Sequence, residues 1–176
     1  ASLAFPALRR RPRPELERFV ECSGQLIHLD GRIGLFEYCL ARLLRRQVIE
    51  ALDPSRHRPA GKRKLAASGD ALAELFAVLA QHGHADPAVA RQAFAAGMGA
   101  VLPQAAFAYQ PPQDWVAALD RALPALDGLD PAGKQLLVEA LVVTTSHDGR
   151  LTVAESELLR TVCACLHCPL PPVLSR

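Results

Sequence analysis

A short stretch occurs twice in this chain, once near each end. The first copy reads Asp30-Gly31-Arg32-Ile33-Gly34-Leu35-Phe36-Glu37, and the second reads Asp148-Gly149-Arg150-Leu151-Thr152-Val153-Ala154-Glu155. No gap is needed to align the two copies, and an apolar helical pattern precedes and follows each of them. A supersecondary unit that is used twice constrains the whole fold. We therefore expect two helix hairpins, one over about residues 14–52 and one over about residues 130–168.

The composition agrees with a chain made of helices. Half of the 176 residues are apolar, Ala and Leu dominate that half, and only 5% are aromatic, whereas strands concentrate aromatic and β-branched residues. The apolar periodicity predicts about seven helices and no strand, so the predicted fold class is an all-α bundle that contains the two hairpins. We expect residues 1–13 to be a basic leader or linker and residues 14–176 to be a single domain, with a flexible basic loop over residues 53–67.

Much of the repeated stretch is explained by folding alone. Thr152 and Glu155 have the spacing of a capping box, in which each residue bonds to the backbone N–H of the other. In the first copy Gly34 takes the place of the Thr and is a weaker cap. The glycine that follows each Asp is predicted to supply a left-handed backbone. The residues that we assign to the structural turns are Gly31, Gly149, Arg32, Arg150 and Thr152.

The aspartates of the two turns need a further explanation. Asp30 and Asp148 follow the carbonyl end of a helix, where a negative charge is disfavoured, so a turn N–H, the neighbouring Arg or a cation should compensate it. The spacing from Gly149 to Glu155 equals that from the glycine to the last glutamate of a calcium loop. Three interpretations stay open at this point: purely structural turns, a weak divalent-cation site, and an acidic recognition surface. The candidate ligands for Ca²⁺ or Mg²⁺ are Asp148, Glu155, Ser146, Asp30 and Glu37.

The cysteines and histidines give weaker signals. Zinc ligands could be sought in Cys163, Cys165, His167 and Cys168, but residues two apart on a helix point in different directions, and zinc sites normally add a second ligand pair elsewhere. Cys22 and Cys39 are predicted to lie at core positions of their helices. His82 and His84 flank a glycine in a helix-ending turn and are predicted to be exposed loop histidines.

Catalytic motifs are missing from the sequence. It contains no H-E-x-x-H, no glycine-rich phosphate loop and no G-x-S-x-G. We therefore assign no catalytic residue and expect no enzyme activity and no cofactor in this segment.

The paired Asp-Gly-Arg-aliphatic-x-x-x-Glu hairpins resemble TerB-like domains, which are small all-helical modules named from tellurite-resistance proteins. The stretch from Asp30 to Tyr38, the pair Asp53-Pro54 and the tail from Asp148 to Pro172 are together similar to the C-terminal cytoplasmic region of bacterial membrane-bound zinc metallopeptidases of the HtpX or CAAX-protease type. The resemblance implies a non-catalytic interaction or regulatory domain at the cytoplasmic face of the inner membrane, with the zinc ligands and catalytic residues of the peptidase upstream. It also implies metal association through the acids of the turns.

The resemblance implies a protein partner, either another chain or the peptidase domain of the same polypeptide. In residues 1–64 Lys and Arg outnumber Asp and Glu two to one, and this basic front end suits contact with an anionic membrane. Because aromatic residues are not interleaved with the charges, we expect no nucleic acid. The alternative functions are a weak divalent-cation sensor and a freestanding stress-related adaptor.

Overall fold

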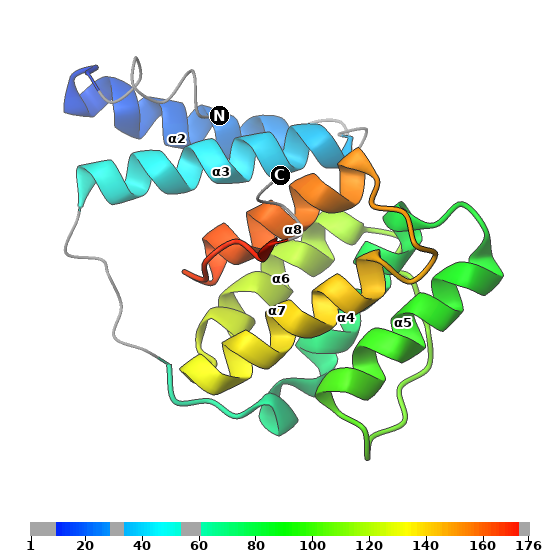
Figure 1. Cartoon of the computed structure of the whole chain (residues 1–176). Coiled ribbons are helices and arrows are strands. Elements are labelled where there is room, and N and C mark those ends of the chain that lie inside the picture. Colours follow the sequence, from blue (N-terminus) through cyan, green and yellow to red (C-terminus); the bar gives the residue numbers. More distant parts are fainter. Residues whose placement is uncertain (1–9, 29–33, 54–60, 173–176) are drawn as a thin grey trace. The chain divides into compact units, whose positions relative to one another are not determined.

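The computed structural model describes residues 10–28, 34–53 and 61–172. These residues form seven α-helices and one short 3-10 helix, and they form no strand, which confirms the prediction of an all-α fold with about seven helices (Figure 1). None of the helices in these ranges has the length and hydropathy that crossing a membrane requires. The elements are α2 (Arg13–His28), α3 (Leu35–Leu52), η2 (Leu65–Ser68), α4 (Gly69–Gly83), α5 (Pro87–Val101), α6 (Trp115–Asp127), α7 (Pro131–Thr145) and α8 (Val153–Cys165).

The chain divides into two compact units, residues 1–59 and residues 60–176, and the division falls within the predicted basic loop. In the first unit α2 and α3 pack against each other. Gly34 precedes α3, and its N–H donates to Glu37 Oε2 at 2.8 Å, which is half of a capping box because glycine has no side chain to complete it. The turn between α2 and α3, with Asp30, Gly31 and Arg32, lies outside the described residues.

The front of the first unit carries part of the predicted basic leader. Residues 1–9 lie outside the described residues. Arg11 and Arg13 form ion pairs with Glu15 and Glu17, one helical turn further on, at 3.6 and 2.9 Å. These pairs neutralise part of the positive charge locally, and membrane contact of the leader stays a prediction.

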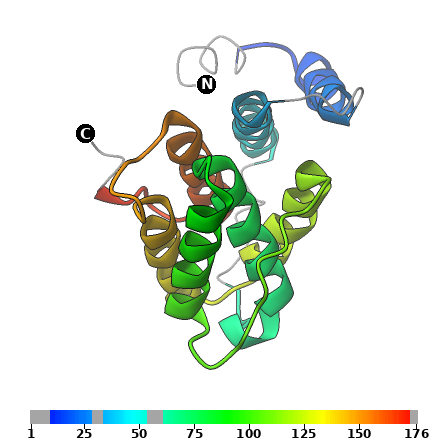
Figure 2. The ribbon, with the colours of Figure 1, turned by 90° about the vertical axis from the view of Figure 1, so that its right-hand side faces the viewer.

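In the second unit α4 is the central helix. It packs against α5, α6, α7 and α8, and its residues 75–80 are buried without interruption. A helix that is apolar on all sides belongs in a core, and the Leu72, Leu75, Phe76 and Leu79 side chains fill this one. Two views show α5 and α7 running side by side next to α4 (Figures 1 and 2). The second unit therefore surrounds one buried helix with four others.

The segment before η2 is anchored to the end of α6. The Arg63 N–H donates to the Gly128 carbonyl at 3.0 Å, and the Asp130 N–H donates to the Arg63 carbonyl at 2.9 Å. The Arg63 guanidinium also donates to the Ala125 carbonyl at 3.1 Å. The last part of the flexible loop predicted over residues 53–67 is therefore ordered. Backbone bonds to a distant segment fix residues 61–64, and η2 follows them. No local sequence pattern reveals such long-range bonds.

Lys134 joins three helices of the second unit. Its ammonium group donates to Asp127 Oδ1 of α6 at 2.8 Å and to the Leu166 carbonyl just after α8 at 2.9 Å. The Lys134 and Asp127 side chains are only 13% and 18% exposed. A cation at the carbonyl end of a helix also interacts favourably with the helix dipole. Lys134 thus stabilises the end of α8 from a position on α7.

Candidate functional site

His84 lies where the end of α4 meets the turn between α7 and α8. It is the first residue after α4, and its N–H donates to the Ala80 carbonyl at 3.2 Å. Its side chain is only 1% exposed, so the prediction of an exposed loop histidine was wrong. The local sequence has the composition of a turn, and the segments that cover the ring come from 60 or more residues further along the chain.

The prediction was wrong for His82 as well. This residue lies within the last turn of α4 and is half-buried. Its ring meets the Trp115 ring edge-on, with 5.0 Å between the centroids. Burial lowers the pKa of His82, because a charged imidazole would lose its hydration there.

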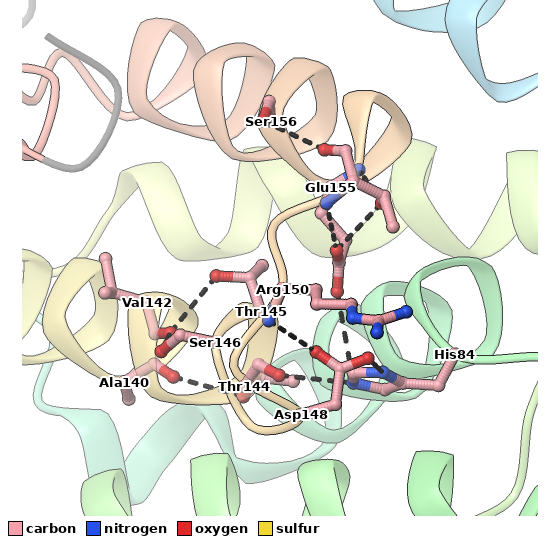
Figure 3. A network of polar contacts seen from close by, with 11 residues as sticks. His84, Ala140, Val142, Thr144, Thr145, Ser146, Asp148, Arg150, Glu155 and Ser156 are labelled. Carbon is pink, nitrogen blue, oxygen red and sulfur yellow. Dashed lines mark hydrogen bonds and ion pairs between the residues drawn. The ribbon is translucent and has the colours of Figure 1, made fainter. Parts of the chain in front are cut away.

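The imidazole of His84 is surrounded by oxygen acceptors (Figure 3). Nδ1 lies 3.6 Å from Asp148 Oδ2, and Nε2 lies 3.3 Å from the Thr144 carbonyl and 3.9 Å from Glu155 Oε1. A neutral imidazole carries one N–H, whereas an imidazolium donates from both nitrogens. Oxygen atoms therefore face both nitrogens of the ring, and Nδ1 makes no hydrogen bond. We call these four residues, His84, Thr144, Asp148 and Glu155, the His84 cluster.

Glu155 is the buried acid of the cluster. Its side chain is 1% exposed, and its Oε2 accepts from both the N–H and the hydroxyl of Thr152 at 2.8 Å. The Glu155 N–H donates in return to Thr152 Oγ1 at 3.2 Å, which confirms the predicted capping box. Oε1 has no hydrogen bond and faces His84. Burial raises the pKa of Glu155, while the bonds from Thr152 and the nearby His84 oppose the increase.

Glycine at position 83 makes room for this carboxylate. A Cβ added to Gly83 would collide with the carboxyl group of Glu155. The last residue of α4 therefore approaches the first turn of α8 so closely that no side chain fits between them. This close packing also excludes water from the buried half of the cluster.

Asp148 is the more exposed acid of the cluster. Its Oδ1 accepts from the Arg150 N–H at 3.0 Å, and this bond, followed by the nearby His84, lowers the pKa of the Asp148 carboxyl group. Gly149 has a φ of 74°, as predicted for a left-handed turn residue, and nothing lies within 4 Å of where a Cβ would be. The expected compensation of the Asp148 charge thus comes from a turn N–H and from a histidine that the sequence did not indicate.

The other candidate metal ligands have different partners. Ser146 Oγ donates to the Val142 carbonyl at 2.6 Å, and Thr144 Oγ1 donates to the Ala140 carbonyl at 3.1 Å. Glu37 bonds to the Gly34 N–H in the first unit. Within the described ranges no group of three or more His, Cys, Asp or Glu side chains is arranged to hold a metal ion, and this includes the cysteines at the end of α8. Binding of Ca²⁺ or Mg²⁺ at the turns stays a prediction.

The capping box gives a direct test of the local structure. We expect Thr152→Ala to lower the free energy of unfolding by about 1 kcal/mol, because the Glu155 N–H loses its acceptor and Glu155 Oε2 loses one of two donors. Thr152→Ser keeps the hydroxyl and should cost less than half as much. Urea unfolding followed by the fluorescence of Trp115, the single tryptophan, measures both variants. Equal losses in the two variants would contradict the role of the hydroxyl.

The His84 cluster is a buried polar contact between the end of α4 and the turn that leads into α8. Chemically it can hold these two segments together, and His84 and Glu155 are too deeply buried to contact a substrate in this conformation. No family model, curated protein or solved structure matches the chain.

Proposed function

We propose that this chain is a non-catalytic interaction or regulatory module of a membrane-bound zinc metallopeptidase. Two kinds of support lead to the proposal. The repeated Asp-Gly-Arg hairpin resembles TerB-like domains and the cytoplasmic region of such peptidases. The second unit, in addition, leaves apolar side chains exposed along one face of α7.

The exposed face of α7 is the observation that carries the proposal. Leu136 and Val143 are 46% and 43% exposed, and their separation of two helical turns places them in one line along the helix. The other sides of α7 pack against α4, α5 and α8. Glu139 lies between Leu136 and Val143 on the same face. It accepts a hydrogen bond from Gln135 at 2.9 Å, so two apolar side chains flank one charged group. Exposed apolar residues next to polar groups are typical of a contact surface for another protein. We infer that the α7 face, defined by Leu136 and Val143, binds the peptidase part of the same polypeptide.

The His84 cluster supports a structural role for the repeated turn. Its polar groups are directed at one another from α4, α7 and α8 (Figure 3). Such a contact fixes the position of α7 relative to the buried helix α4. A rigid α7 presents its outer face in one defined geometry, which favours recognition by a partner.

The reading frame upstream of Ala1 provides the first test. Hydrophobic spans and an H-E-x-x-H helix there would agree with the proposal. A start codon close upstream without either feature would contradict it and favour the freestanding adaptor. Calorimetric heat on titration with Ca²⁺ or Mg²⁺ that Asp148→Ala abolishes would favour the cation sensor instead.

The α7 face provides the second test, in the full-length parent protein. We expect the double variant Leu136→Asp, Val143→Asp to change the cleavage rate of an unfolded protein substrate by about tenfold, which corresponds to about 1.4 kcal/mol of lost contact energy. Gln135→Ala, at an exposed neighbour that donates to Glu139 on the same helix, is the control because it adds no charge, and it should leave the rate unchanged. The free energy of unfolding of each variant, measured by Trp115 fluorescence, must stay within about 0.5 kcal/mol of that of the native protein, as expected for surface substitutions. An unchanged cleavage rate in the double variant would contradict the proposal.

A further inference from the structure

The end of α8 brings two cysteines together through its backbone. The Cys168 N–H donates to the Cys163 carbonyl at 2.9 Å, and the His167 N–H donates to the Ala164 carbonyl at 3.2 Å. Between them His167 has a left-handed φ of 56°. These two bonds and the left-handed residue define a Schellman motif, a common way to end a helix. The side chains at these two positions of the motif are frequently in contact, and here both are cysteines.

The two thiols are neighbours in different surroundings. Cys163 is fully buried, whereas Cys168 is half-buried and accessible from solvent. Burial raises the pKa of Cys163 to about 12, with the nearby Cys168 as the second cause. A direct backbone bond between two residues also keeps their Cα atoms within the range of about 4.4–6.8 Å that disulfides span. The pair therefore satisfies the backbone requirement for a disulfide.

A lysine lies beside the accessible thiol. Cys168 Sγ donates to the Leu166 carbonyl at 3.6 Å, and the same carbonyl accepts from Lys134 Nζ at 2.9 Å. Burial raises the pKa of the Cys168 thiol, while the ammonium group of Lys134 opposes the increase and Asp127 adds to it. A nearby cation and solvent access are the features that make one thiol of a pair react first.

We propose that Cys163 and Cys168 are a redox-modification site, which low-molecular-weight disulfides such as oxidised glutathione convert into an intramolecular disulfide. The Cys168 thiolate attacks one sulfur of the small disulfide, forms a mixed disulfide and releases one small thiolate. The Cys163 thiolate then attacks Cys168 Sγ, which forms the protein disulfide and releases the second small thiol. Two protein thiols lose their protons and two electrons, and the small disulfide is reduced to two thiols.

The disulfide would reinforce the cap of α8. It links the two residues that the Schellman motif already joins, so the contact of Lys134 with the Leu166 carbonyl is kept. Closing the loop also restricts the unfolded chain, which raises the stability of the folded state. Oxidation therefore strengthens the end of α8 without a change of fold.

Mass mapping of the whole chain tests the proposal. After incubation with excess oxidised glutathione at about pH 8 and alkylation of the free thiols, we expect a Cys163–Cys168 cross-link and a higher unfolding midpoint. The rate should rise about tenfold per pH unit around neutral pH, because both thiols are mostly protonated there. Cys165→Ala, which removes the neighbouring thiol, should leave the cross-link intact.

Three results would overturn the proposal. The first is a glutathione adduct on Cys168 that does not close. The second is a cross-link between Cys165 and Cys168, and the third is oxidation confined to the exposed Cys22, which the sequence had placed in the core. The Cys168→Ala protein should stay folded, because this residue is half-buried and lies after the end of α8. The same substitution must abolish the cross-link.

Discussion

Replacing His84 with Ala is expected to lower the free energy of unfolding of the second unit by about 3 kcal/mol near pH 7. The substitution removes the ring whose nitrogens face Asp148 and Glu155, and the buried carboxyl group of Glu155 then loses the polar group that its Oε1 faces. Leaving a buried polar group without its partner costs about 1–3 kcal/mol, and the loss of the buried ring itself places the value at the upper end. Trp115 lies in α6, so its fluorescence follows unfolding of the second unit alone.

The cost of His84→Ala should shrink as the pH falls from neutral towards the unfolded pKa of a glutamate, about 4.3. Burial raises the pKa of Glu155 above its value in the unfolded chain, so the protonated form is favoured by folding. The stabilisation that comes from this raised pKa is fully present below the pKa of Glu155 in the unfolded chain. It is lost as the pH rises through the pKa of Glu155 in the folded protein. Without His84 the pKa of Glu155 in the folded variant rises further, because His84 opposes the increase in the native protein. Protonating Glu155 at low pH therefore stabilises the variant more than the native protein.

Two variants separate this explanation from a simple loss of packing. Glu155→Gln keeps a side chain that can complete the capping box but removes the carboxylate. His84→Ala should therefore lower the free energy of unfolding by at least about 1 kcal/mol less in the Glu155→Gln protein than in the native protein. His147→Ala removes an exposed ring whose centroid lies 6.5 Å from that of His84 and should cost less than about 0.5 kcal/mol. If His84→Ala costs the same with Gln at position 155, the contact of His84 with Glu155 does not stabilise the turn.

The helices themselves could be predicted well from local sequence. Asp130 and Pro131 start α7 as N-cap and first helical residue, and the Asp130 side chain accepts from the Gly133 N–H at 2.7 Å. The Thr152–Glu155 capping box starts α8, as predicted. These signals are local, because capping groups bond within one turn of the helix.

The candidate site could be predicted only in part. The position of Asp148 after a helix end indicated that its charge needs compensation, and the structure shows the Arg150 N–H and His84 in that role. His84 itself could not be found, because its turn of Gly, Ala, Asp and Pro is typical of exposed loops and its burial depends on segments far along the chain. The one available signal was the unpaired Asp148 together with a histidine at a helix end.

Gly97→Ala is expected to lower the free energy of unfolding by about 2 kcal/mol, although alanine favours helix formation. Gly97 is buried on α5 where this helix crosses α7, and an added Cβ would collide with Thr144 Oγ1 and with the ring of Phe76. Neither group can move freely, since Thr144 Oγ1 is bonded to the Ala140 carbonyl and Phe76 is part of the buried face of α4. Overpacking of this kind costs about 1–3 kcal/mol, which exceeds the helix-propensity gain of about 1 kcal/mol.

Gly99→Ala is the matched control two residues further along α5. Nothing lies within 4 Å of a Cβ at Gly99, so this substitution should raise the free energy of unfolding by about 0.5 kcal/mol through helix propensity alone. The Thr144 carbonyl also faces His84. If the alanine side chain at position 97 pushes α7 away from α5, the His84 cluster should therefore be disturbed. The double variant Gly97→Ala, His84→Ala should then lose at least about 0.5 kcal/mol less than the sum of its parts. If the losses in free energy of unfolding of the two single variants add up exactly in the double variant, the spacing of α5 and α7 and the contact at His84 are independent. A gain of stability in Gly97→Ala alone would contradict the close approach of the two helices.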